Sequence, residues 1–186
     1  SGRVITNNAN AVSSVFALDL DRDGDIDIVA GESGDNTIAW YENDGSSNPS
    51  WTKTILTNSV TGTSVYVSDV DSDGDLDILS ASRGSARIDW YENDGAINPS
   101  FTTVNIDTEA GGVLDIGVTD IDGDGDLDLY SSNYEGTLNW FENNGNVNPS
   151  WTKNVIANRN ANANVYESAH GDIDNDGDLD IVSASY

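Results

Sequence analysis

The sequence has no cysteine, no methionine and only one histidine among its 186 residues. Without cysteine, neither a disulfide framework nor a thiolate metal site can form, and one histidine excludes a zinc site made of several histidines of one chain. No apolar run approaches the roughly 20 residues that span a bilayer. The first residues lack the basic and apolar segments of a signal peptide, so we expect a mature or excised piece of a protein.

Basic residues are also scarce. Seven Lys and Arg stand against 33 Asp and Glu, which gives a formal net charge of −26. This balance argues against nucleic-acid binding, which needs clustered basic residues, and against docking on anionic lipid. The sequence still predicts a folded chain, because 37% of the residues are hydrophobic and 5 Trp, 7 Tyr and 3 Phe are present.

The acidic residues are concentrated in four clusters that recur along the chain. Each cluster has five Asp at alternate positions, and successive clusters begin 50, 51 and 52 residues apart, at Asp19, Asp69, Asp120 and Asp172. Two other motifs, Trp40-Tyr41-Glu42-Asn43 and Asn48-Pro49-Ser50-Trp51, each return twice in the same order. Self-similarity at a fixed period indicates a repeat protein with units of about 50 residues.

Each unit reads as β-structure. In the first unit, short β-branched and aromatic segments predict strands at 15–18, 26–30, 37–41 and 51–56, and no segment has a helical pattern. The turn signal Asn-Asp-Gly at 43–45 closes the third strand. Four antiparallel strands at this period predict an all-β fold of β-propeller blades.

The repeat also predicts where the blades begin and end. Val4 to Asn7 matches Ile55 to Asn58, so residues 1–11 are expected to supply the fourth strand of a preceding blade. Three full blades are expected at 12–61, 62–111 and 112–161, followed by the first half of a fourth blade at 162–186. Because propellers usually close with four to eight blades, we expect the chain to self-associate or to be part of a longer chain.

The clusters have the composition of a cation site. Asp at positions 1, 3 and 5, Gly at 6 and Asp at 9 describe a loop that curls around a hard cation, and a set of oxygen ligands suits Ca²⁺. An acidic turn without metal is the alternative, but two carboxylates 4 Å apart repel by about 4 kcal/mol at an effective dielectric near 20. An EF-hand is excluded, because position 12 is Ala30, Ser80, Ser131 or Ser183 where that loop needs Glu.

The pattern D-x-D-x-D-G-x-x-D between two short strands resembles the FG-GAP and VCBS-type repeats of extracellular β-propellers, which include integrin α-subunit heads and bacterial surface proteins. The Phe-Gly and Gly-Ala-Pro words of that family are absent, so the match is closer to the bacterial VCBS-like branch, and integrin-style ligand recognition is not carried over. The resemblance implies about four Ca²⁺ ions, each held by positions 1, 3, 5, 7 (through its carbonyl) and 9. The implied metal-binding residues are Asp19, Asp21, Asp23, Asp25, Asp27, Asp69, Asp71, Asp73, Asp75, Asp77, Asp120, Asp122, Asp124, Asp126, Asp128, Asp172, Asp174, Asp176, Asp178 and Asp180.

Outside the loops, residues that keep the period are expected to be structural. The repeating Trp40, Trp90 and Trp140 are predicted to pack between blades rather than to stack on sugars, and the repeating Glu42, Glu92 and Glu142 to have structural or surface roles. Residues that break the period are better candidates for a specific site, although drift within a repeat is the simpler explanation for each. They are Arg83, Arg87, Glu109, Asp115, Tyr130, Tyr134, Glu167 and His170.

No catalytic constellation can be assembled from these residues. The sequence therefore predicts a non-catalytic, secreted, Ca²⁺-binding propeller module at the cell surface, serving adhesion, carbohydrate or protein binding, or surface assembly. Two alternatives stay open. One is the propeller portion of a carbohydrate-active enzyme of the polysaccharide lyase or sugar dehydratase type, and the other is a structural repeat of a surface fibre.

Overall fold

The computed structural model describes residues 4–61, 63–158 and 165–185, and within these residues all regular structure is β-strand. No helix in this part of the chain has the length and hydropathy needed to cross a membrane. The first sheet is β1 (Val12–Leu18), β2 (Asp27–Glu32), β3 (Thr37–Asn43) and β4 (Trp51–Thr57). The second is β5 (Thr63–Ser68), β6 (Asp77–Ser82), β7 (Arg87–Asn93) and β8 (Phe101–Asp107). The third is β9 (Val113–Thr119), β10 (Asp128–Asn133), β11 (Thr137–Asn143) and β12 (Trp151–Asn158), and a last pair is β13 (Val165–Gly171) and β14 (Asp180–Ser185).

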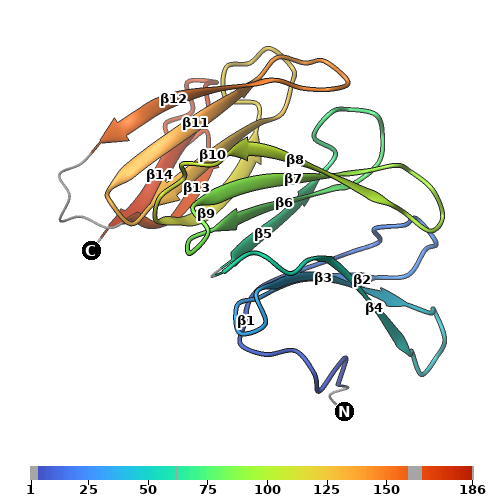
Figure 1. Ribbon diagram of the computed structural model, residues 1–186. Helices are drawn as coiled ribbons and strands as arrows, with labels where there is room; N and C mark the ends of the chain where they lie inside the picture. The colour runs from blue at the N-terminus through green and yellow to red at the C-terminus, as the bar shows by residue number, and fades with distance from the viewer. Residues whose placement is uncertain (1–3, 62, 159–164, 186) are drawn as a thin grey trace.

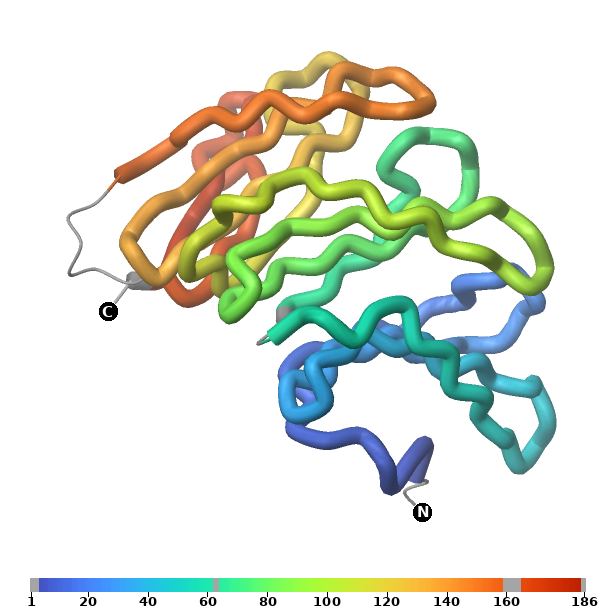
Figure 2. Tube along the Cα trace, viewed as in Figure 1, coloured from blue at the N-terminus to red at the C-terminus, as the bar shows by residue number. Residues whose placement is uncertain are grey.

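The sheets follow one another as the blades of an open fan (Figures 1 and 2). Every pairing is antiparallel between strands consecutive in the chain. The first strands of the blades lie innermost, where β5 contacts both β1 and β9, and β9 contacts β13. The predicted all-β fold of repeated four-stranded antiparallel blades is confirmed, and the fan does not close into a ring.

The core lies between blades. Successive side chains of a strand point to opposite faces of its sheet, so neighbouring aromatic residues of β7 serve different interfaces. Tyr91 packs with Ile38 and Trp40 of the first blade, whereas Trp90 packs with Ile116 and other residues of the third. Blade-to-blade packing thus accounts for the Trp-aromatic pair that recurs in each repeat.

At the interface between the third blade and β13, a glycine replaces an aromatic residue of the other blades, and a neighbouring tyrosine fills the space. Gly117 of β9 stands where the first two blades have Phe16 and Tyr66, and the ring of Tyr130 from β10 fills the space. A Cβ atom on Gly117 would lie 2.2 Å from Cζ of Tyr130. The hydroxyl of Tyr130 is 3.1 Å from Nδ1 of His170 on β13, and the rings meet edge to face. Tyr130 and His170, two residues that break the repeat, therefore join adjacent blades.

The N-terminal segment differs from the prediction, because residues 4–11 contain no strand. An outermost strand pairs only with the third strand of its own blade, and the described chain has no such strand before residue 12. The segment instead crosses the β2–β3 turn of the first blade, where the amides of Ser33 and Gly34 each donate a 3.1 Å hydrogen bond to the carbonyls of Ala11 and Asn10. Thr61 makes the same crossing in the second blade, accepting a hydrogen bond from Gly84.

Candidate metal centres

Each Asp-rich loop joins the first strand of a blade to the second, at the same end of all four inner strands. The loop is wound tightly, because two of its residues have left-handed backbone. The glycine at position 6 has φ between +98° and +100° in all four loops, a conformation that side chains rarely adopt. Position 4 is also left-handed in every loop, at Arg22, Ser72, Gly123 and Asn175.

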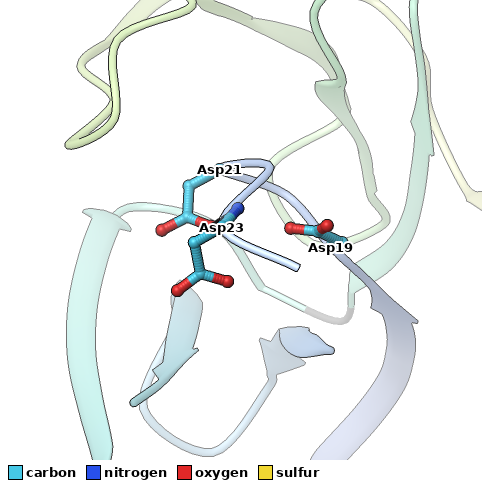
Figure 3. Close-up of side chains that lie close together, drawn as sticks. All are labelled: Asp19, Asp21 and Asp23. Atoms are coloured by element: carbon cyan, nitrogen blue, oxygen red, sulfur yellow. Dashed lines mark hydrogen bonds between the residues drawn. The ribbon is translucent and has the colours of Figure 1, made fainter. Parts of the chain in front are cut away.

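This winding brings three carboxylates together in every loop. In the first loop, oxygens of Asp19, Asp21 and Asp23 lie within 4.8 Å of one another (Figure 3). In each of the other loops, oxygens of three carboxylates also lie within 4.8 Å of one another. They are Asp69, Asp71 and Asp73 in the second loop, Asp120, Asp122 and Asp128 in the third, and Asp172, Asp174 and Asp180 in the fourth.

In the first two loops, hydrogen bonds inside the loop use only one oxygen of each grouped carboxylate, whereas Asp120 and Asp172 of the last two loops accept with both oxygens. In the first loop, Oδ2 of Asp19 accepts from the amide of Gly24 at 3.1 Å, and Oδ1 of Asp21 accepts from the amide of Asp23 at 3.2 Å. Oδ1 of Asp23 accepts from the amide of Asp25 at 2.9 Å. The loop amides thus fix these carboxylates, and in the first two loops the second oxygen of each is left for another partner.

Several of these second oxygens are buried without a donor. Oδ1 of Asp19, Oδ1 of Asp69 and Oδ2 of Asp71 are inaccessible to solvent and receive no hydrogen bond from the described residues. Leaving a buried charged oxygen unpaired costs free energy. One hard cation in each loop would pair the unpartnered oxygens of that loop, so the residues present fit such an ion.

The position 9 carboxylates fasten the loop to its own blade. In the second loop, Asp77 accepts from the amide of Val70 at 3.2 Å and from the amide of Asn93, at the end of β7, at 2.8 Å. Burial raises the pKa of Asp77 to about 7 and also raises the pKa of Asp27 and Asp128. A positive ion beside these buried carboxylates would favour their charged form.

In the first three loops, the position 7 side chains point away from the groups. Oδ2 of Asp75 lies 1.9 Å from where a Cβ of Gly95 would be, so it packs against the β7–β8 turn. Its Oδ1 pairs with Arg22 of the first loop at 2.7 Å. Asp25 and Asp126 pack against the corresponding turns of their own blades. This placement leaves only the main chain of position 7 for a ligand role.

The structure therefore brings together most, but not all, of the predicted side chains. Positions 1 and 3 belong to a group in every loop, position 5 in the first two loops, and position 9 in the last two. The predicted side-chain ligands outside these groups are Asp27, Asp77, Asp124 and Asp176, and the predicted carbonyl ligands Asp25, Asp75, Asp126 and Asp178 contribute no carboxylate to them.

One buried charged cluster was missed by the sequence reasoning. Glu32 is completely buried and accepts hydrogen bonds from Lys53 at 2.7 Å, from Thr37 at 3.1 Å and from the hydroxyl of Tyr41. Burial alone would raise the pKa of Glu32, but the bonds from Lys53 and Tyr41 outweigh it and lower the pKa. The sequence did contain a signal for this cluster, because Glu32 breaks the repeat. The equivalent residues of the second and third blades are Ser82 and Asn133.

Comparison with protein families finds three matches to an FG-GAP-like repeat, over residues 19–80, 69–131 and 120–183. Each match begins at the first Asp of one loop and ends just after the following loop, so neighbouring matches overlap at a loop. Together they span most of the chain and all four candidate metal centres. A comparison with curated proteins gave no match.

Proposed function

Because the chain belongs to the FG-GAP-like repeat family, we propose that its four Asp-rich loops bind Ca²⁺, about four ions in all, and that these ions stabilise a non-catalytic binding module. The observation that carries this proposal is the presence of buried carboxylate oxygens without donors in the first two loops. Ca²⁺ accepts six to eight oxygens at 2.3–2.6 Å in a flexible geometry, which suits loops made of carboxylates and carbonyls.

Each ion would take side chains at positions 1, 3, 5 and 9 and the carbonyl at position 7. When bound, Ca²⁺ supplies positive charge at the point where the carboxylates converge, and four ions would change the formal charge from −26 to −18. The loops join the first two strands of their blades, so neutralising them stabilises each blade where its inner strand ends.

We propose that the protein works outside the cell. Extracellular Ca²⁺ is millimolar, and modules that work there bind it with dissociation constants of about 10⁻⁴–10⁻³ M. Sites of that affinity are filled outside the cell and largely empty in the cytosol. Calcium would then act as a structural component that is present wherever the module works.

The position of the single histidine favours a binding role over catalysis. His170 pairs with Tyr130 between two blades, so the most versatile acid-base group of the chain serves packing. Adhesion, carbohydrate or protein binding, and surface assembly are the roles that suit such a scaffold.

Association with a further blade is part of the proposal. On the outer face of the first blade, Val15 and Ile55 are 61% and 54% exposed and lie in one row with Ala30 and Ala39. At the other end of the fan, β14 pairs only with β13 among the described strands. Blades normally bury such faces and edges against their neighbours, so we expect a second copy or a longer chain to supply a covering blade.

A pair of substitutions in the second loop tests the metal assignment. Asp73→Ala removes a carboxylate of the candidate centre, whereas Asp75→Ala removes an equal charge from a side chain that points away from it. In calorimetric titration with Ca²⁺, we expect the wild type and Asp75→Ala to bind about four ions and Asp73→Ala about three. Equal loss of one ion in both variants would show that coordination in the loop is assigned wrongly.

A further inference from the structure

Equivalent positions of the four inner strands form a second cluster, at the opposite end of the strands from the metal loops. The residue five positions before the first Asp of each loop is Ser14 on β1, Ser64 on β5, Asp115 on β9 and Glu167 on β13. These side chains line one cavity of about 480 Å³, together with Arg83 and Tyr166. The four blades thus meet around a pocket to which each contributes.

The charged residues that line the pocket are the ones that differ between the blades. The equivalent position is Ser in the first two blades and a carboxylate in the last two. Arg83 follows β6 where the first blade has Ser33, and it also faces the cavity. Arg83, Asp115 and Glu167 are far apart in the sequence but line one pocket. This shared position distinguishes them from unrelated substitutions scattered over the repeats.

Each charged group retains capacity for a ligand. Asp115 accepts from the hydroxyl of Ser64 at 3.2 Å and from the amide of Ser168 at 3.4 Å, and each carboxylate oxygen has a second lone pair. The carboxylate of Glu167 has no hydrogen bond or ion pair within the described residues. The guanidinium of Arg83 lies 4.6 Å from the ring centroid of Tyr134 and forms no ion pair in this part of the chain, so its N–H groups are available.

We propose that this cavity binds a neutral saccharide unit, as the ligand of the binding module proposed above. The carboxylates would accept hydrogen bonds from sugar hydroxyls, while the guanidinium of Arg83 and the serine hydroxyls would donate to sugar oxygens. Tyr166 lines the cavity and is 47% exposed, and in this proposal its ring would pack against the apolar side of a sugar ring. The volume lies within the range of small-molecule pockets.

The mixed charge of the lining selects against other ligands. A cationic ligand would meet Arg83, and an anionic ligand would meet Asp115 and Glu167. Burial, with a smaller contribution from the neighbouring Glu167, raises the pKa of Asp115, and an anionic ligand would add to the same repulsion. A neutral ligand with many hydroxyls satisfies both kinds of group without this penalty.

The chain provides its own conservative replacements for a test. Asp115→Ser and Glu167→Ser install the residue that the first two blades have at the same position, and Arg83→Ser installs that of the first blade. Calcium-loaded protein would be titrated with the methyl glycosides of glucose, galactose and mannose, with binding followed by NMR. We expect at least one glycoside to bind and the double variant Asp115→Ser/Glu167→Ser to weaken it at least tenfold. Glu109→Ser, which removes an exposed acid outside the cavity, should leave binding unchanged.

Three results would overturn the proposal. They are binding of none of the glycosides, glycoside binding that survives in the double variant and in Arg83→Ser, and binding of only a zwitterion such as glycine or lysine. The number of Ca²⁺ ions and the melting temperature, measured on every variant, separate this outcome from the function proposed above. A wild-type protein that binds four Ca²⁺ ions but no glycoside would refute the saccharide site alone. A wild-type protein that binds no calcium would refute the proposed calcium-binding module itself.

Discussion

Excess chelator is expected to lower the melting temperature of this protein by more than 10 °C. A ligand that binds only the folded state adds RT ln(1 + [L]/Kd), about 2.7 kcal/mol per site at a hundredfold excess over Kd. Four such sites would contribute on the order of 10 kcal/mol, and each kcal/mol shifts the melting temperature of a domain of this size by about 2–4 °C. Scanning calorimetry in Ca²⁺ and in chelator measures the difference directly.

The structural reason is the crowding of carboxylates at the end of each inner strand. Without an ion, three carboxylates whose oxygens lie within 4.8 Å repel one another, and Asp19, Asp69 and Asp71 keep buried oxygens without donors. Mg²⁺ should restore little stability, because it requires near-ideal octahedral geometry at 2.0–2.1 Å and dehydrates reluctantly. An unchanged melting curve in chelator, or equal rescue by both ions, would contradict calcium-dependent folding.

Trp90→Ala is expected to destabilise the protein by about 3–5 kcal/mol, the range for removing a large aromatic side chain from a core. Trp90 is 1% exposed and packs between the second and third blades. Denaturant unfolding in saturating Ca²⁺ would measure the change in the free energy of unfolding.

Trp140 provides a matched control in the third blade. It is only partly buried, and its strand partner Tyr130 contacts His170, so its face of the sheet meets the two-stranded last blade. Trp140→Ala should therefore cost clearly less than Trp90→Ala. If Trp90→Ala left stability unchanged, the recurring tryptophans would not be packing residues, and the alternative of exposed sugar-stacking platforms would regain support.

The repeat was predictable from sequence because its determinants are local. Alternating Asp with Gly at position 6 predicts the loop, and the β-branched segments beside it predict the strands that it joins. The segment at Val4 shows the limit of this reasoning, since it matches a fourth strand in sequence but has no third strand to pair with in the described chain. Strand formation there depends on a tertiary partner, and local pattern carries no information about one.

The features that make the blades unequal were harder to predict. The sequence singles out Arg83, Asp115 and Glu167 as departures from the repeat, but only the packing of the blades brings the inner strands β9 and β13 and the turn after β6 to one cavity. The buried cluster around Glu32 likewise depends on cross-strand pairing, which places Thr37 opposite it and Lys53 opposite Tyr41. The usable signal in the sequence was a departure from the repeat, because residues at equivalent repeat positions lie at equivalent places in their blades.

Native mass spectrometry with and without Ca²⁺ tests the central claim most directly, because it counts the ions on each chain. The same spectra report the oligomeric state, for which association through the end blades predicts assemblies larger than the 19.8 kDa monomer. We predict about four Ca²⁺ ions per chain at millimolar calcium, all removed by chelator. A chain that carries no calcium under these conditions would contradict the assignment of the four loops as metal centres.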